Sequence, residues 1–317
     1  QIDILHWISR AALEIIGQSA LGYSFDPLVE GAKPHPFGAA KEFSPATDDL
    51  LFLREYLLQN LIKIGPPYFR RFIIDHCPWK NPRRIRDVID TMDRVTTHIF
   101  EEKKRALASV PTEKDLIAIL MKANMNTNEE DRLPDKEVTF AFAGTDTTSN
   151  VLAQILHLLS YRPEIQDKLR DEITTILGDH MESDKSYDEL MSLPLMDAVC
   201  RETLRLHPPI TFVTRVATKD YILPLSVPIE GLDNRNMKSI FVPAGTKLFV
   251  SIRDINRDPT LSGPDSFEWK PERWISRKLR QYMMRVFPAS TLTCSMTFLG
   301  GARACIGFKF SELEIGA

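Results

Sequence analysis

The pattern of apolar and polar residues predicts a chain that is mostly helical up to about residue 206. Apolar residues recur at helical spacing in four stretches, 1–25, 48–64, 83–107 and 112–123. The first stretch ends near Gly22, and the second is stopped by Gly65-Pro66-Pro67. The proline- and glycine-rich residues 27–45 predict a loop between them.

Three more helices are expected in the middle of the chain. Residues 135–160 are apolar on nearly all sides, which predicts a long buried helix. Pro163 begins a charged surface helix that ends at Gly178, a residue suited to the position after a helix. A further helix covers about 194–206 and stops before Pro208-Pro209.

The pattern changes after the paired prolines. Residues 211–223 and 239–252 are rich in Val, Ile, Phe and Thr, which predicts strands. Residues 254–297 read as irregular, and the segment after Cys305 reads as helical. The expected fold class is therefore mainly α, with a large helical body and a small β element.

Composition narrows the class of protein. The chain has 317 residues, is 43% hydrophobic and 26% charged, and has a net charge of −3. These values fit a globular protein and give no argument for binding nucleic acid or an anionic membrane. Four cysteines without a C-x-x-C pair do not form a disulfide framework and favour a reducing compartment. Neither an apolar run of 18 residues nor a signal peptide is visible, and Gln1 suggests that the natural N-terminus lies further upstream.

The stretch FLGGARACIG, from Phe298 to Gly307, contains the pattern F-x-x-G-x-R-x-C-x-G. Gly301 and Gly307 allow a tight turn and a close approach to a flat ligand. Cys305 is expected at a helix N-terminus, where the helix dipole stabilises a thiolate. Arg303 is suited to bind a carboxylate of a bound cofactor. The alternative is that Cys305 is a packed free cysteine.

A second pattern, Ala143-Gly-Thr-Asp-Thr-Thr148, interrupts the apolar central helix with polar residues. Thr side chains inside a helix bond back to the carbonyl four residues earlier and bend the helix. Ala143 and Gly144 leave space beside the backbone. Asp146 next to Thr147 is also how a proton relay would be arranged. The alternatives are a helix that passes near solvent and a kink without chemistry.

Two further patterns contain paired charges. In Glu202-Thr-Leu-Arg205, Glu202 lies on the apolar stripe of its helix and Arg205 borders it. A charged pair on an apolar face is costly unless it is fully hydrogen-bonded. The alternative is an ordinary surface pair. In Pro271-Glu-Arg-Trp274, Arg273 taken alone reads as exposed.

These four patterns, in this order, resemble the cytochrome P450 haem-thiolate monooxygenases. FLGGARACIG resembles the haem-binding loop, AGTDTT the oxygen-activating segment, ETLR the E-x-x-R helix, and PERW the segment that completes a Glu–Arg–Arg cluster. The flanking segments LPLMDAVCRETLRLHPP, VPAGT and INRD also match the family, and they resemble its fungal members. The resemblance runs over residues 1–317 and implies a single cytochrome P450 domain. That domain is expected to lack the N-terminal anchor, the first sheet region and the C-terminal sheet.

The resemblance implies roles for residues at the matching positions. Cys305 would be the axial thiolate on the iron of haem b, iron protoporphyrin IX. Phe298, Gly301 and Gly307 would shape the loop against the porphyrin. Arg303 and Arg215 would bind the haem propionates, and Ala143 and Gly144 would line the oxygen groove. Asp146 and Thr147 would be the acid–alcohol pair that delivers protons. Glu202, Arg205 and Arg273 would form a structural network.

The implied reaction inserts one atom of O₂ into an apolar small organic substrate. The electrons would come from NADPH through a partner, NADPH–cytochrome P450 reductase. For a full-length protein, the implied location is the cytosolic face of the endoplasmic reticulum membrane, where an N-terminal anchor that is expected to be missing here would hold it. The present chain alone is expected to be soluble and cytoplasmic. One alternative is a non-catalytic fragment that does not hold haem productively. Another is a haem protein that isomerises or dehydrates its substrate, against which the Asp146–Thr147 pair argues.

Overall fold

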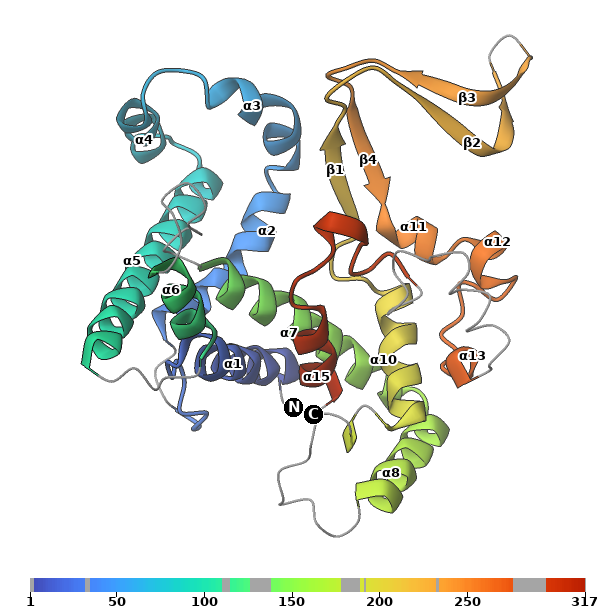
Figure 1. Ribbon diagram of the computed structural model, residues 1–317, viewed down its shortest axis with the longest axis horizontal. Coiled ribbons are helices and arrows are strands. Elements are labelled where there is room, and N and C mark those ends of the chain that lie inside the picture. The colour runs from blue at the N-terminus through green and yellow to red at the C-terminus, as the bar shows by residue number, and fades with distance from the viewer. Residues whose placement is uncertain are drawn as a thin grey trace. The chain divides into compact units, whose positions relative to one another are not determined.

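A computed structural model of the chain describes residues 3–31, 35–109, 115–125, 138–177, 189–190, 192–231, 234–275 and 295–316. The chain consists of two compact units, Gln1–Ala153 and Gln154–Ala317. The boundary between them lies within one long helix (Figure 1). Several sequence-based expectations lie outside the described residues, namely the helix start at 135–137, part of the helix at 112–123, the helix end at Gly178 and most of the irregular region, 276–294.

Helices make up the regular structure that is described in the first unit. They are α1 (Ile4–Ile16), the π-helical turn η1 (Gly17–Leu21), the 3-10 helix η2 (Pro36–Glu42), α2 (Phe43–Asp48), the π-helical turn η3 (Leu53–Leu57), α3 (Leu58–Leu61), α4 (Pro67–Asp75), α5 (Lys80–Ser109), α6 (Leu116–Met125) and α7 (Val138–Ser160), which continues into the second unit. The expected helices near 1–25, 83–107 and 112–123 are thus present.

The loop expected at 27–45 is partly wrong, because η2 and α2 begin inside it. Pro36 occupies the first turn of η2, where its missing N–H has no consequence. The side chain of His35 accepts a hydrogen bond from Phe37 N at 3.2 Å and caps the helix. Phe37 and Ala46 are buried. A few apolar residues that become buried therefore outweigh the proline-rich local sequence.

The expectation that the central helix is buried on nearly all sides is also wrong. Along the described part of α7, the buried residues form a stripe, Thr148, Val151, Ile155 and Leu159, with Ser149 beside it. Leu156, on another face, is 44% exposed. Residues three or four apart share one face of a helix, so this stripe accounts for a single packed face.

The second unit contains helices and four strands. The first helices are α8 (Pro163–Leu177) and α10 (Pro194–Leu206). Strand β1 (Phe212–Val216) pairs antiparallel with β4 (Lys247–Ser251), and β2 (Tyr221–Glu230) pairs antiparallel with β3 (Asn236–Val242). The β2–β3 ladder has an irregularity between Pro224 and Ile229. Each of the two expected strand regions thus covers parts of two strands.

Helix α10 is the centre of the second unit. Short helices α11 (Ile252–Asn256) and α13 (Glu272–Ile275) contact it, as do α8 and α15 (Phe308–Gly316), while α12 (Pro259–Ser262) follows α11 (Figure 1). Ala198, Val199 and Leu206 of α10 are buried, as the sequence predicts. A mainly helical body with a small β element is confirmed. Among the helices that the structure describes, none has the length and apolarity needed to cross a membrane.

Candidate functional site

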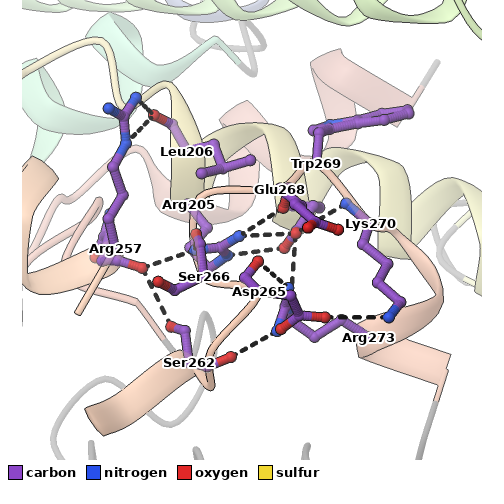
Figure 2. A network of polar contacts seen from close by, with 12 residues as sticks. Arg205, Leu206, Arg257, Ser262, Asp265, Ser266, Glu268, Trp269, Lys270 and Arg273 are labelled. Carbon is purple, nitrogen blue, oxygen red and sulfur yellow. Dashed lines mark hydrogen bonds and ion pairs between the residues drawn. The ribbon is translucent and has the colours of Figure 1, made fainter. Parts of the chain in front are cut away.

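Glu202, on α10, is buried in the second unit. It is hydrogen-bonded to Arg205, Lys270 and Arg273, which Figure 2 shows within a network of polar contacts. Its side chain is 0% exposed and its carboxylate accepts five hydrogen bonds. The donors are Arg205 Nε at 2.8 Å, Arg205 Nη2 at 2.8 Å, Lys270 N at 3.0 Å, Arg273 Nε at 3.2 Å and Trp274 Nε1 at 2.8 Å. The desolvation of the carboxylate is thereby offset.

Both guanidinium groups make several hydrogen bonds. Arg205 uses all five of its N–H groups: besides Glu202, they donate to the carbonyl oxygens of Asn256, Ser266 and Glu268. Arg273 donates to Ser262 O at 2.6 Å and to Asp265 Oδ1 at 2.8 Å. The Arg273 hydrogen bond lowers the pKa of the Asp265 carboxyl below its ordinary value. Two buried guanidinium groups therefore face two carboxylates, and the exposed Lys270 ammonium also pairs with Asp265 at 3.0 Å.

The structure thus brings Glu202, Arg205 and Arg273 together, although Arg273 is 71 residues from Glu202 in the chain. Both alternatives from the sequence, a surface Glu–Arg pair and an exposed Arg273, are wrong because all three side chains are buried. The sequence did not assign a role to Trp274 or Asp265. Trp274 could have been noticed, since it is the last residue of the PERW pattern.

The loop that carries Cys305 lies in the same unit. Cys305 N donates to Phe298 O at 2.8 Å, which closes the loop, and Gly301 adopts a φ of +69° that favours glycine. The ring of Phe298 meets that of Phe308 edge to face at 5.0 Å. Cys305 is exposed, so the alternative of a packed cysteine is wrong. Helix α15 begins at Phe308, so Cys305 lies just before the helix rather than at its first residue.

Cys305 differs from the other cysteines that the structure describes, Cys77 and Cys200. Burial raises the pKa of the Cys200 thiol to about 12, which keeps it protonated near neutral pH. The exposed side chain of Ile306, at 87%, lies next to Cys305 in the chain. Cys305 therefore combines an accessible sulfur with an apolar neighbour and a fixed backbone.

Two arginines near the expected ligand region are accessible. Arg303 is exposed in the 3-10 turn Gly301–Arg303. Arg215 is exposed on β1, where it pairs with Leu248 and its Nη1 donates to Thr214 O at 2.8 Å. Gly301 and Gly307 have open space where a Cβ would lie. Gly301, Gly307 and Arg303 therefore provide open space and a positive charge within the loop itself.

The AGTDTT segment belongs to the first unit. Thr147 Oγ1 donates to Ala143 O at 2.6 Å, the back-bond that the sequence predicts. Asp146 Oδ2 accepts from Ser44 Oγ of α2 at 2.9 Å. A Cβ on Gly144 would lie 3.2 Å from Ile16 of α1, so one flank of this glycine is already occupied. Ala143 is exposed. The sequence had not singled out Ser44, which lies 102 residues from Asp146.

A cavity of about 210 Å³ adjoins this segment within the first unit. Thr145 and Asp146 line it together with polar side chains from α1 and the following turns, namely His6, Ser9, Arg10, Asp26, His35 and Lys41. Arg10 donates to both carboxylate oxygens of Asp26 at 2.7 Å and thereby lowers the pKa of Asp26. Asp146 consequently borders a cavity whose walls combine these polar side chains with the apolar Leu13, Phe37 and Ala40.

Comparison with known proteins identifies the family. The cytochrome P450 family model matches residues 1–317. The chain belongs to the cytochrome P450 family. Cytochrome P450 monooxygenase 91 of Postia placenta is 47% identical over 99% of this chain and 60% of its own length. Ganoderic acid synthetase of Ganoderma lucidum is 37% identical, with the same coverage. The chain thus spans about 60% of the length of these fungal relatives.

Solved cytochrome P450 structures share the fold. One crystal structure, of CYP102L1, superposes with a TM-score of 0.70 at 22% identity and covers 99% of this chain and 63% of that protein. The heme domain of cytochrome P450DA gives the same TM-score at 20% identity. The mostly helical arrangement is therefore that of cytochrome P450s.

Membership of the cytochrome P450 family implies haem b as the cofactor. Where the structure is described, no cluster of three or more His, Cys, Asp or Glu side chains could hold a metal ion. A single accessible thiol suits a metal whose other ligands come mainly from a macrocycle. Cys305 is exposed and its backbone amide is fixed, so it is chemically suited to that role.

Proposed function

We propose that this chain is the haem-bearing part of a monooxygenase that inserts one atom of O₂ into an apolar small organic substrate. Thiolate-bound haem supplies the activation of O₂ in such an enzyme. The observation that carries the proposal is the exposed Cys305 thiol on a loop closed by the Cys305 N–Phe298 O hydrogen bond. The names of the fungal relatives, which include monooxygenases and a ganoderic acid synthetase, support the reaction class and an organic substrate.

In this proposal Cys305 is the axial ligand, and the loop shape comes from Phe298, Gly301 and Gly307. Arg303 and Arg215 bind the carboxylates of the haem, since guanidinium groups pair well with carboxylates. The exposure of both arginines supports this role. Glu202, Arg205 and Arg273 hold the chain behind the loop in one conformation, which their complete hydrogen bonding supports.

Asp146 and Thr147 are proposed to move protons. Thr147 Oγ1 is a donor held at a fixed position by Ala143 O, and Asp146 Oδ2 is within hydrogen-bond distance of Ser44 Oγ. The cavity beside Asp146, whose walls include Arg10, Asp26 and Lys41, would supply water to this carboxylate. Ala143, which is exposed, and Gly144, one flank of which Ile16 occupies, are proposed to line the oxygen groove next to the pair.

Two partners complete the proposed reaction. Electrons come from NADPH through NADPH–cytochrome P450 reductase, and O₂ is the second substrate. We also propose that the full-length protein lies at the cytosolic face of the endoplasmic reticulum membrane. Exposed apolar side chains of α3 and α4, including Tyr68 and Phe72, support membrane contact by this chain as well as by an anchor.

The test of the haem-thiolate proposal is the spectrum of the purified, reduced protein under carbon monoxide. A thiolate-ligated haem gives a red-shifted Soret band, which we expect from the protein and not from Cys305→Ser. Cys77→Ser is the matched control and should keep the band. Absence of the band in the unaltered protein would favour the non-catalytic fragment, and its persistence in Cys305→Ser would refute the ligand assignment.

A further inference from the structure

Asn256 holds the two residues that lead into the cysteine loop. It is the last residue of α11 and is 2% exposed. Its side-chain Oδ1 accepts from Met296 N at 2.8 Å, and its Nδ2 donates to Thr297 Oγ1 at 3.0 Å. Both ends of one amide are therefore used on two successive residues, some 40 positions further along the chain.

The donors and acceptors of this contact have one consistent arrangement. Met296 N can only donate, so it must face the amide oxygen of Asn256. The hydroxyl of Thr297 donates to Leu204 O of α10 at 2.8 Å, so it accepts from Asn256 Nδ2. Asp would lack the donor at this position and Leu would lack both groups, which makes the contact specific to an amide.

The backbone of Asn256 is itself fixed by the buried charge network. Its carbonyl oxygen accepts from Arg205 Nη1 at 2.9 Å and from Ser262 Oγ at 3.2 Å. Arg205 in turn is held by Glu202. The amide of Asn256 therefore extends from a rigid point, which limits the entropy that the contact must overcome.

The other end of the contact reaches Cys305. Thr297 precedes Phe298, whose carbonyl oxygen accepts from Cys305 N at 2.8 Å. Leu299 N donates to Met296 O at 2.9 Å and closes a turn over the same residues. Every step from Glu202 to the backbone of Cys305 is thus a hydrogen bond or a covalent link in the chain.

We propose that Asn256 is the positioning residue for Cys305, the part that transmits the fixed geometry of the Glu202–Arg205–Arg273 network to the thiol-bearing loop. The inference rests on the proposed role of Cys305 as the haem ligand. It assigns a function to the INRD segment that is distinct from packing, because the side chain of Asn256 contacts the loop residues Met296 and Thr297 directly.

The test is amide hydrogen exchange of the purified protein, followed by mass spectrometry of peptides that contain Cys305 and of peptides from α10. Asn256→Leu removes both hydrogen bonds of the contact, with little change in side-chain volume. Thr297→Val removes the bond from Asn256 Nδ2 and the bond from the Thr297 hydroxyl to Leu204 O, and leaves the one from Met296 N. Since two hydrogen bonds are lost in each variant, exchange of the loop peptide should accelerate by about tenfold or more, while that of α10 stays constant. Thr297→Ser retains the hydroxyl and should exchange like the unaltered protein.

Ser262→Ala is the matched control, because it removes a hydrogen bond to the same Asn256 carbonyl without touching residues 296 and 297. Unchanged loop exchange in Thr297→Val overturns the proposal, also in the case that Asn256→Leu does not fold. Equal acceleration in Ser262→Ala overturns it as well. The red-shifted band of the carbon monoxide complex is recorded in parallel: its absence from the unaltered protein would refute the proposed function, whereas its loss in Thr297→Val alone supports the positioning role.

Discussion

At the scale of single residues, Thr147 and Thr148 are neighbours with different surroundings. The hydroxyl of Thr147 is bonded to Ala143 O, whereas Thr148 Oγ1 is buried and has no hydrogen-bond partner in the part of the chain that is described. A buried hydroxyl without a partner destabilises a protein by about 1–3 kcal/mol. Thr148 is therefore expected to destabilise the fold, and a substitution of Thr148 is a suitable control for the same substitution of Thr147.

We therefore expect Thr147→Val to affect the coupling of NADPH consumption to product formation, and Thr148→Val to affect only the stability of the fold. Thr147→Val removes the proposed proton donor, so product formed per NADPH consumed should fall at least about tenfold and hydrogen peroxide should be released instead. Thr148→Val should leave this ratio unchanged and raise the free energy of unfolding by about 1 kcal/mol. The measurements are product and peroxide yields and urea denaturation. Full coupling in Thr147→Val would contradict the relay role.

At the scale of elements, the buried network joins α10 to the residues around α11, α12 and α13. Glu202 connects to donors at 205, 270, 273 and 274, and Arg205 to carbonyls at 256, 266 and 268. The segment 256–274 forms little regular structure, so these hydrogen bonds replace a continuous helix or sheet as the means of fixing it.

Glu202→Gln should consequently be severely destabilising. It leaves two buried guanidinium groups with Asp265 as the remaining carboxylate of the network, and removing one partner of a buried ion pair costs about 3–5 kcal/mol. The loss is measured as the free energy of unfolding in urea. Asp167→Asn, which breaks an exposed i,i+3 pair on α8, is the control and should have no measurable effect. A change below about 1 kcal/mol for Glu202→Gln would show that the network does not stabilise the fold.

Sequence patterns predicted the elements with long apolar stripes and missed those defined by distant contacts. The helix expected at 194–206 has the observed bounds of α10, because its apolar spacing and its flanking prolines are local features. Helices η2 and α4 were not expected, since short helices contain few repeats of the pattern. Arg273 looked exposed until the resemblance was considered, because its partner Glu202 is 71 residues away. The role of Ser44 depends on a similarly distant contact and left no local pattern. The INRD segment, which contains Asn256, matched the family without indicating a role, because the loop residues it contacts lie about 40 positions away.

At the scale of the whole molecule, charge and exposed apolar area are unevenly distributed along the chain. Residues 51–90 contain eight Lys and Arg but four Asp and Glu, whereas the whole chain has 40 and 43. The same stretch exposes many large apolar side chains, among them Phe52, Tyr56, Ile62, Tyr68, Phe72 and Trp79. Exposed aromatic residues beside basic ones are typical of segments that lie in the interface of an anionic membrane.

The purified protein should therefore bind vesicles through this segment. We expect more co-sedimentation with vesicles that contain phosphatidylserine than with pure phosphatidylcholine, and less at 0.5 M salt, a test condition at which charges are screened beyond about 4 Å. Tyr68→Ser combined with Phe72→Ser should weaken binding at least about tenfold, because burying each ring is worth about 1.5–3 kcal/mol. Phe267→Ser is the control: Phe267 is also an exposed aromatic residue but lies in the second unit. If Phe267→Ser weakens binding as much, or if no vesicles are bound, contact with the membrane is not made by residues 51–90.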